Sequence, residues 1–260
     1  MDSPTNPFPE SAAPGPLGSS HTATSASTPG DVKFAAADPS LTEDQALATL
    51  QHSDLSAESI EQLVKNSSVM KSRKVRIAIA AHPRTPRHVS LRLIREFYTF
   101  DLMQFTVLPA VAADLKRAAD EMMIKRIASI TLGERISLAR RASTAVAAAL
   151  LLDKETRVWQ TALENSRLTE VAIVRTLQRS NLSRAFVEAV CHHPKWSLRH
   201  EVRVALLRNE KTPMARALEF ARTLPPRQLR DILRNSRLPE KVKNYLRKER
   251  NGEQVKEITD

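Results

Sequence analysis

Apolar residues recur along this chain at intervals of three and four positions, in short runs that polar turns separate. One such stripe contains Val171, Val174 and Leu177, and another contains Leu229 and Ile232. This spacing places the apolar side chains on one face of an α helix. Helices this short are marginal in isolation, so they must stack on neighbours to bury their stripes. The pattern therefore predicts an all-α chain of short, stacked helices.

Two segments about half the chain apart follow the same pattern. They run from Lys74 to Ile94 and from Glu201 to Ala221, and a shift of 127 positions superimposes them. The shift places Val75 on Val202, Arg76 on Arg203, Ala78 on Ala205, Thr85 on Thr212, Pro86 on Pro213 and, further on, Leu102 on Leu229. Such self-similarity is the sequence signature of a repeat protein. Repeat proteins usually present a long binding surface, so the pattern indicates a binding function.

A recurring polar turn separates the helices. It begins with a residue that we call the anchor, and Ser, Thr or Pro follows four positions later. The anchors are His52, His82, Asn165, Arg179, His193, Asn209 and Asn235. Asn and His tolerate the left-handed conformation that ends many helices, so we expect the anchors to adopt it.

The residues after each anchor are expected to begin the next helix. A Ser or Thr N-cap accepts a backbone N–H from the new first turn, and Pro fits the first helical position. The predicted repeat caps are Thr85, Pro86, Thr169, Thr212 and Pro213. Thr42 with Gln45, and Thr131 with Glu134, have the spacing of a capping box.

Residues 65–94, 150–177 and 191–218 carry a resemblance to a known family. They combine a D-x-x-x-R-V step, as at Asp153 to Val158, with an N-P-x-T-P-like step, as at Asn209 to Pro213. In this rhythm the chain resembles the leucine-rich-repeat-variant and HEAT-like group of bacterial α-solenoids, which have an ARM-type fold. The resemblance implies a superhelix of short paired helices and a binding function. Some members carry a cysteine-ligated iron–sulfur module, but this chain has only Cys191, so no cofactor is expected.

The distribution of glycine and proline divides the chain. Gly133 is the only glycine between positions 31 and 251, which argues against β-sandwiches, Rossmann domains and P-loop enzymes. Residues 1–40 hold seven of the 15 prolines and three of the five glycines. They carry too little apolar surface to order themselves, which predicts a disordered leader. We expect the α-solenoid at 41–250, with longer helices at 110–152, and a flexible tail at 251–260.

The leader lacks the basic start and apolar stretch of a signal peptide. The longest strongly apolar run, at 145–152, is far too short to cross a bilayer, so no membrane insertion is expected. A lone cysteine fits a reducing compartment. Together these features predict a cytoplasmic protein.

Positive charge is concentrated toward the end of the chain. The formal net charge is +11, and residues 200–250 hold fourteen Lys or Arg against six Asp or Glu. A basic end suggests an acidic partner, either a nucleic acid, an acidic protein surface or anionic lipid. Arg227, Arg230 and Arg234 fall on one helical face, opposite the apolar stripe. They are the candidate polyanion-binding residues, although an ordinary solvated face is the simpler interpretation.

Three further groups have both a structural and a functional interpretation. Cys191, His192 and His193 resemble a metal site, but adjacent residues on a helix face different ways, so no metal is expected. The repeated arginines, Arg76, Arg157 and Arg203, are interpreted as ion pairs or carbonyl caps between units. Trp159 and Trp196 are expected in the core.

No catalytic motif stands out, so we expect no enzyme. The predicted function is a non-enzymatic scaffold that binds a protein partner, and its oligomeric state stays open. The alternative is a nucleic-acid-binding solenoid that uses the basic C-terminal third. A third hypothesis is a HEAT-like DNA glycosylase, which would use an aromatic residue and an acid such as Trp159 and Asp153.

Overall fold

The computed structural model describes residues 38–256, with side chains placed for residues 38–248. Within that range every regular element is helical, which confirms the predicted all-α class. The elements are α2 (Glu43–Thr49), α3 (Ala57–Lys65), η1 (Val69–Lys71), α4 (Arg73–Ala81), α5 (Arg87–Glu96), α6 (Thr99–Val107), α7 (Ala113–Arg126), α8 (Leu132–Arg141), α9 (Thr144–Leu150), α10 (Thr156–Leu163), α11 (Glu170–Leu177), α12 (Arg184–His192), α13 (His200–Arg208), α14 (Met214–Arg222), α15 (Pro226–Arg234) and α16 (Glu240–Lys256).

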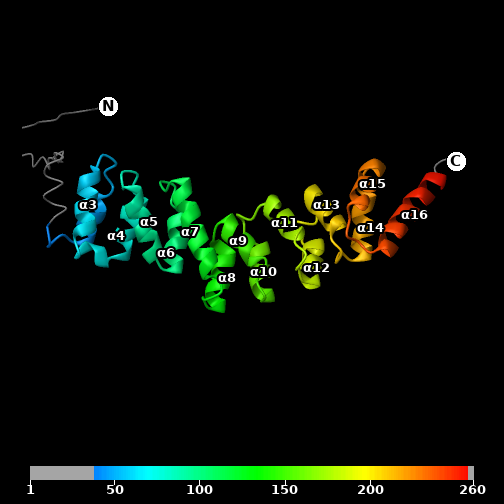
Figure 1. Ribbon diagram of the computed structural model, residues 1–260, viewed down its shortest axis with the longest axis horizontal. Helices are drawn as coiled ribbons and strands as arrows, with labels where there is room; N and C mark the ends of the chain where they lie inside the picture. The colour runs from blue at the N-terminus through cyan, green and yellow to red at the C-terminus, as the bar shows by residue number, and fades with distance from the viewer. Residues whose placement is uncertain (1–37, 257–260) are drawn as a thin grey trace, which may run out of the picture.

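The helices follow one another along the long axis of the molecule in chain order, as Figure 1 shows. From α5 onward each odd-numbered helix packs on the next odd-numbered one, in an unbroken row that ends at α15. Even-numbered helices form a second row, in which α2, α4 and α6 pack together and α8, α10 and α12 pack together. We call this arrangement the double row. Each helix thus contacts helices that are near it in sequence.

One continuous apolar core runs between the two rows. Most helices contribute two to four buried side chains, spaced three or four residues apart, as the stripes predicted. Ile60 and Leu63 of α3, for example, are fully buried, and so is Leu93 of α5 apart from 1% of its surface. Burying a side chain of this size contributes about 1.5–3 kcal/mol, so packing stabilises helices that are too short to form alone.

The 127-residue shift found in the sequence also superimposes secondary structure. It carries the first residues of α4, α5 and α6 onto the first residues of α13, α14 and α15. The number of helices between the two copies has a consequence for packing. α13 is the ninth helix after α4, an odd offset, so the second copy lies in the opposite row. Accordingly α4 packs against α2 and α6, whereas α13 packs against α11 and α15.

The domain boundaries differ from the prediction at both ends. Residues 1–37 and 257–260 lie outside the described residues. Near the start, the backbone carbonyl of Asp38 accepts a hydrogen bond of 2.7 Å from Asn66, so residues 38–40 belong to the folded array and not to the leader. Near the end, α16 continues to Lys256, into the predicted tail, because residues 240–256 are rich in strong helix formers.

Several predicted caps are confirmed. Thr42 with Gln45 and Thr131 with Glu134 form reciprocal capping boxes at the starts of α2 and α8. Thr169 accepts a hydrogen bond from the backbone N–H of Ala172 and caps α11. The central stretch 110–152 is only partly as predicted, because α7 is long whereas α8 and α9 are of ordinary length.

The prediction that Thr85 and Thr212 are N-caps is wrong. Each hydroxyl points back to the helix before it: Oγ1 of Thr85 donates to the carbonyl of Ile79 at 2.5 Å. Oγ1 of Thr212 likewise donates to the carbonyl of Leu206 at 2.6 Å. The last carbonyls of a helix lack partners within it, so these hydroxyls stabilise the ends of α4 and α13.

The two prolines hold the N-cap positions of the following helices. Pro86 precedes α5 and Pro213 precedes α14, one position earlier than predicted, and neither has a side chain that can form a cap hydrogen bond. A residue before proline favours extended backbone, which directs the threonine away from the new helix.

Candidate functional site

The anchor residues organise the turns, though not in the predicted way. His82, His193 and Asn209 have extended backbones, with ψ of 133°, 126° and 130°, so the expectation of a left-handed conformation is wrong for them. Instead the side chain accepts the N–H two residues later. Oδ1 of Asn209 accepts from Lys211 at 3.0 Å, and Nδ1 of His82 accepts from Arg84 at 3.2 Å. This local hydrogen bond turns the chain without a positive φ.

The second polar atom of the anchor side chain, Nδ2 of Asn or Nε2 of His, links two helices of one row. Nδ2 of Asn209 donates to the carbonyl of Leu177 at 2.9 Å, which joins the ends of α13 and α11. Nδ2 of Asn165 donates to the carbonyl of Ala139 at 2.8 Å, which joins α10 to α8. Nε2 of His82 pairs with the carbonyl of His52 at 3.1 Å. Asn and His can exchange at this position because each offers one acceptor and one donor.

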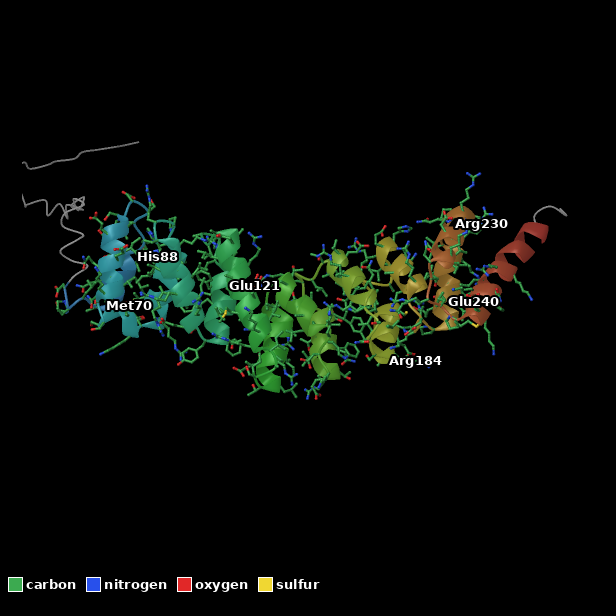
Figure 2. All side chains as sticks on the ribbon, viewed as in Figure 1. Met70, His88, Glu121, Arg184, Arg230 and Glu240 are labelled. Carbon is green, nitrogen blue, oxygen red and sulfur yellow. The ribbon has the colours of Figure 1, made fainter. Side chains whose placement is uncertain are left out.

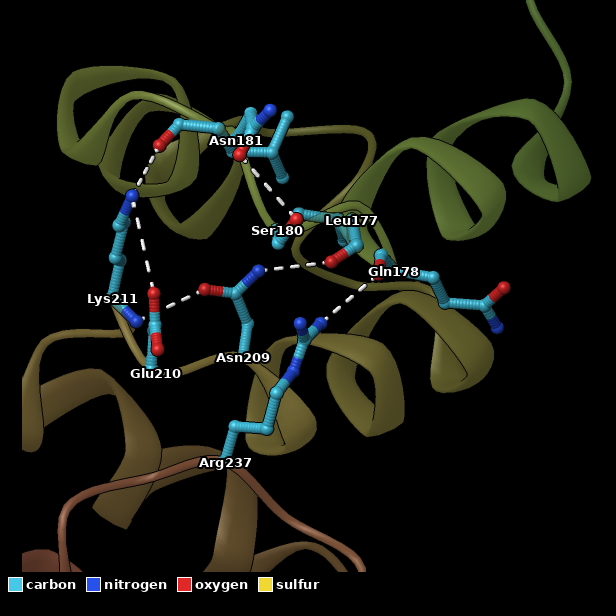
Figure 3. A network of polar contacts seen from close by, with 9 residues as sticks. Leu177, Gln178, Ser180, Asn181, Asn209, Glu210, Lys211 and Arg237 are labelled. Carbon is cyan, nitrogen blue, oxygen red and sulfur yellow. Dashed lines mark hydrogen bonds and ion pairs between the residues drawn. The ribbon is translucent and has the colours of Figure 1, made fainter.

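Three downstream residues hold the loop between α11 and α12. Nδ2 of Asn209 donates to the carbonyl of Leu177, the last residue of α11, and Nη2 of Arg237 donates to the carbonyl of Gln178 at 3.0 Å. Nζ of Lys211 donates to the carbonyl of Leu182 at 2.7 Å. Figure 3 shows these side chains reaching from two later turns toward one loop. The loop at 178–183 is therefore fixed from the α13–α14 turn and from the α15–α16 turn.

This fixed loop forms one wall of an open groove of about 740 Å³, which we call the central groove. The α9–α10 turn at 151–155 and the first residue of α10 form the opposite wall, and Arg237 contributes from the α15–α16 turn. The floor contains Trp159 and Phe186, whose rings meet edge to face with centroids 5.6 Å apart. Polar side chains line the rim: Thr156, Gln178, Ser180, Asn181 and Ser183.

The charges of the central groove are unbalanced. Lys154, Arg179 and Arg237 line it, against one carboxylate, that of Asp153. Nη1 of Arg135 lies 2.8 Å from both oxygens of Asp153, and the N–H of Glu155 donates to the same carboxylate at 2.9 Å. The side chain of Asp153 is only 3% exposed. Because Arg135 neutralises Asp153, the groove presents positive charge to solvent.

These contacts bear on the two residues named for the glycosylase hypothesis. The carboxylate of Asp153 is bound to Arg135 and to the turn, and the ring of Trp159 is 4% exposed against Phe186. Trp196 is 1% exposed, and its Nε1 donates to the carbonyl of Leu163 at 2.9 Å. Both tryptophans thus lie in the core, as predicted. Neither offers an open ring face on which a nucleobase could stack.

The three candidate arginines lie together on the outer face of α15. Arg227, Arg230 and Arg234 are exposed, whereas Leu229 and Ile232 of the same helix are buried. Figure 2 shows Arg230 projecting away from the double row. Within the described part of the chain, none of the three arginine side chains forms an ion pair or a hydrogen bond. We call this set the α15 arginine face.

The predicted repeat arginines fall into different environments. Nε of Arg203 donates to the carbonyl of Ser197 at 2.7 Å, so it caps a carbonyl as predicted, although within its own unit. Nε of Arg76, at the equivalent position, is buried and has no hydrogen-bond partner among the described residues. Arg157 is exposed. Of the three, Arg203 alone caps a carbonyl, and in the part of the chain that the structure describes none of them joins two units through a hydrogen bond or an ion pair, so the predicted link between units is wrong.

Cys191, His192 and His193 do not converge on a common point. Cys191 is fully buried, His192 is exposed, and Nδ1 of His193 accepts the N–H of Lys195 at 3.1 Å. Burial raises the pKa of the Cys191 thiol to about 12, which keeps it protonated and a poor metal ligand. Among the described residues, no group of three or more His, Cys, Asp or Glu side chains is placed to hold a metal ion.

Sequence reasoning missed the central groove. Arg179 was assigned to the anchor set, yet it is exposed and forms no link of the anchor kind. Every other anchor is Asn or His, so an arginine at this position was the one signal in the sequence that Arg179 has a different role. Lys154 and Arg237 gave no signal, because only the packing of three distant turns brings them to one place.

Comparison of this chain with protein-family models, with curated proteins and with solved structures gave no match. None of the described helices has the length and apolar character that a membrane span requires.

Proposed function

We propose that this protein is a non-enzymatic scaffold that binds a protein partner along its double row of helices. The observation that carries the proposal is the elongated array itself, in which helices pack on near neighbours and leave long rows of side chains exposed. Architectures of this kind typically act by presenting an extended surface. The central groove adds a rigid, charged recess to that surface.

The family assignment and the location belong to the same proposal. A double row of short helices with linked turns supports a HEAT-like α-solenoid related to the leucine-rich-repeat-variant group. The single cysteine is a buried free thiol, which fits work in the cytoplasm.

A pulldown with and without nuclease tests the scaffold proposal. The full chain is immobilised, and bound material is compared between treated and untreated extracts. We expect a stoichiometric protein partner that survives nuclease and moderate salt. If all captured protein disappears on nuclease treatment, the partner is a nucleic acid and the scaffold proposal fails.

The α15 arginine face favours a second candidate, a nucleic-acid-binding function. Arg227, Arg230 and Arg234 are exposed on one helix face, in the most basic part of the chain, with no carboxylate bound to them among the described residues. Such a face can contact successive phosphates.

Changing all three arginines to Glu tests this second candidate. If a nucleic acid is the partner, binding to single-stranded or duplex DNA falls by orders of magnitude, and the slope of log K against log salt flattens by roughly three. The thermal unfolding transition should stay in place, because exposed charges contribute little to stability. This candidate is contradicted if the wild-type chain binds DNA only weakly and releases it at physiological salt.

A further inference from the structure

The central groove brings together three cations, and two of their side chains have no partner inside the described fold. Lys154 comes from the α9–α10 turn and Arg179 from the α11–α12 loop, and within the described residues neither side chain forms an ion pair or a hydrogen bond. Arg237 comes from the α15–α16 turn and uses one nitrogen on the carbonyl of Gln178. Three positive charges near one another repel, and the one carboxylate in the lining, that of Asp153, is already paired with Arg135. A bound anion would therefore lower the electrostatic free energy of the groove.

The chemistry of the lining distinguishes among anionic ligands. Trp159 and Phe186 in the floor are 4% and 1% exposed, so no aromatic face is open to stack a base. The rim instead offers the amides of Gln178 and Asn181 and the hydroxyl of Ser180, all on exposed residues. Amides and hydroxyls both donate and accept, and so match the alternating N–H and C=O groups of an extended peptide.

The groove is also fixed before any ligand arrives. Its α11–α12 wall is held by hydrogen bonds from Asn209, Lys211 and Arg237 (Figure 3). Its α9–α10 wall is held by Arg135 through Asp153. A rigid site loses little conformational entropy on binding, which favours capture of a flexible chain. The volume of about 740 Å³ lies in the range of sites that hold ligands larger than a simple ion.

From this geometry we infer that the central groove binds an extended, acidic segment of a protein partner, whose carboxylates pair with Lys154, Arg179 and Arg237. The inference rests on the proposed scaffold function and names the chemistry of its partner. The backbone N–H and C=O groups between the carboxylates face the amide and hydroxyl rim.

Titration of the full chain with a fluorescent peptide that alternates Glu and Ser tests the inference. The same peptide with Gln in place of Glu serves as the neutral control. The double variant Lys154→Glu and Arg179→Glu should weaken binding of the acidic peptide at least about tenfold, since two attractions become repulsions. Neither side chain has a partner within the fold, so the thermal transition should not move.

A charge-matched variant separates a specific groove from general attraction. Arg227→Glu with Arg230→Glu changes the net charge by the same amount but lies on α15, outside the groove lining. We expect it to change the affinity for the acidic peptide less than about twofold at physiological salt, where the screening length is about 8 Å. Equal losses in the two double variants would overturn the inference, and so would equal binding of the Glu and Gln peptides.

Two further outcomes distinguish this inference from the proposed function. If a nuclease-resistant partner is captured equally well by wild type and by the Lys154→Glu, Arg179→Glu variant, the groove inference fails while the scaffold stands. If single-stranded DNA competes with the acidic peptide and is lost in the same groove variant, the groove serves nucleic acid and the inference is overturned. Loss of the captured partner together with loss of the acidic peptide, in the groove variant alone, supports both.

Discussion

The blocks α4–α6 and α13–α15 have the same framework and different surfaces. Their buried positions correspond: Leu102 and Leu229 are 0% and 3% exposed, and Phe105 and Ile232 are 0% and 2% exposed. On α6 the corresponding positions hold Phe100, Met103 and Val107, where α15 has Arg227, Arg230 and Arg234. Phe100 and Val107 are exposed, and Met103 is partly buried against the core. One helix face is therefore apolar in the first block and cationic in the second.

The difference teaches which positions the fold constrains. A buried position must keep an apolar side chain, because a cavity or an unpaired polar group there would cost several kcal/mol, on the order of 2–5. An outer position contributes little to stability, so the fold leaves its side chain free to vary. Phe100 and Val107 are 43% and 45% exposed, so the first block presents apolar area where the second presents charge. The repeat thus supplies a common framework for unlike surfaces.

The largest effect is expected from the shared core. Leu102→Ala and Leu229→Ala should each lower the free energy of unfolding by about 2–5 kcal/mol, measured by urea denaturation. Leu102→Ala should cost more, because α6 packs against both α4 and α7, whereas α15 packs chiefly against α13. A loss below about 1 kcal/mol at Leu229 would break the equivalence of the two blocks.

The next largest effect on stability is expected at the anchors. His82→Ala and Asn209→Ala should each cost about 1–3 kcal/mol, because a carbonyl at a helix end and a backbone N–H in the turn lose their partners. Asn209→Asp is the matched control, since it keeps the acceptor for Lys211 and removes the donor to Leu177. An aspartate as stable as the wild type would show that the link between α13 and α11 contributes nothing.

The two threonines should have smaller effects. Thr85→Val and Thr212→Val keep the side-chain shape and remove the hydroxyl, so each should cost about 1 kcal/mol. Thr212 should show the larger loss, because it is 5% exposed while Thr85 is only partly buried. Amide exchange should quicken at the end of the preceding helix, α4 or α13. Faster exchange confined to the first turn of α5 or α14 would restore the N-cap interpretation.

The smallest effect on stability is expected from exchanging the two outer faces. Placing Arg at Phe100 and Val107, or Phe and Val at Arg227 and Arg234, should change the free energy of unfolding by about 0.5 kcal/mol or less per site, because all four positions are exposed. Any binding to single-stranded DNA should follow the arginines to α6. If it stays with α15 after the exchange, the surrounding surface and not the arginine face carries it.

The sequence by itself determined the local features of this protein. The three-and-four spacing identified the helices and their buried faces, including the opposition of Leu229 and Ile232 to the α15 arginine face. Capping-box spacing identified the starts of α2 and α8. The 127-residue shift identified equivalent helices to the residue at which they begin. These features depend on contacts within a turn or two of chain, so local pattern was sufficient.

Tertiary structure alone decided the rest. The direction of the Thr85 and Thr212 hydroxyls depends on carbonyls six residues back, and the partner of Asn209 lies 32 residues back. Arg237 reaches Gln178 across 59 residues, and only that packing brings Lys154, Arg179 and Arg237 to one groove. Small rotations between successive helices add up along the array, and local propensity does not encode their sum. For that reason the row in which each copy lies, and the groove between distant turns, emerge only from the stacked helices.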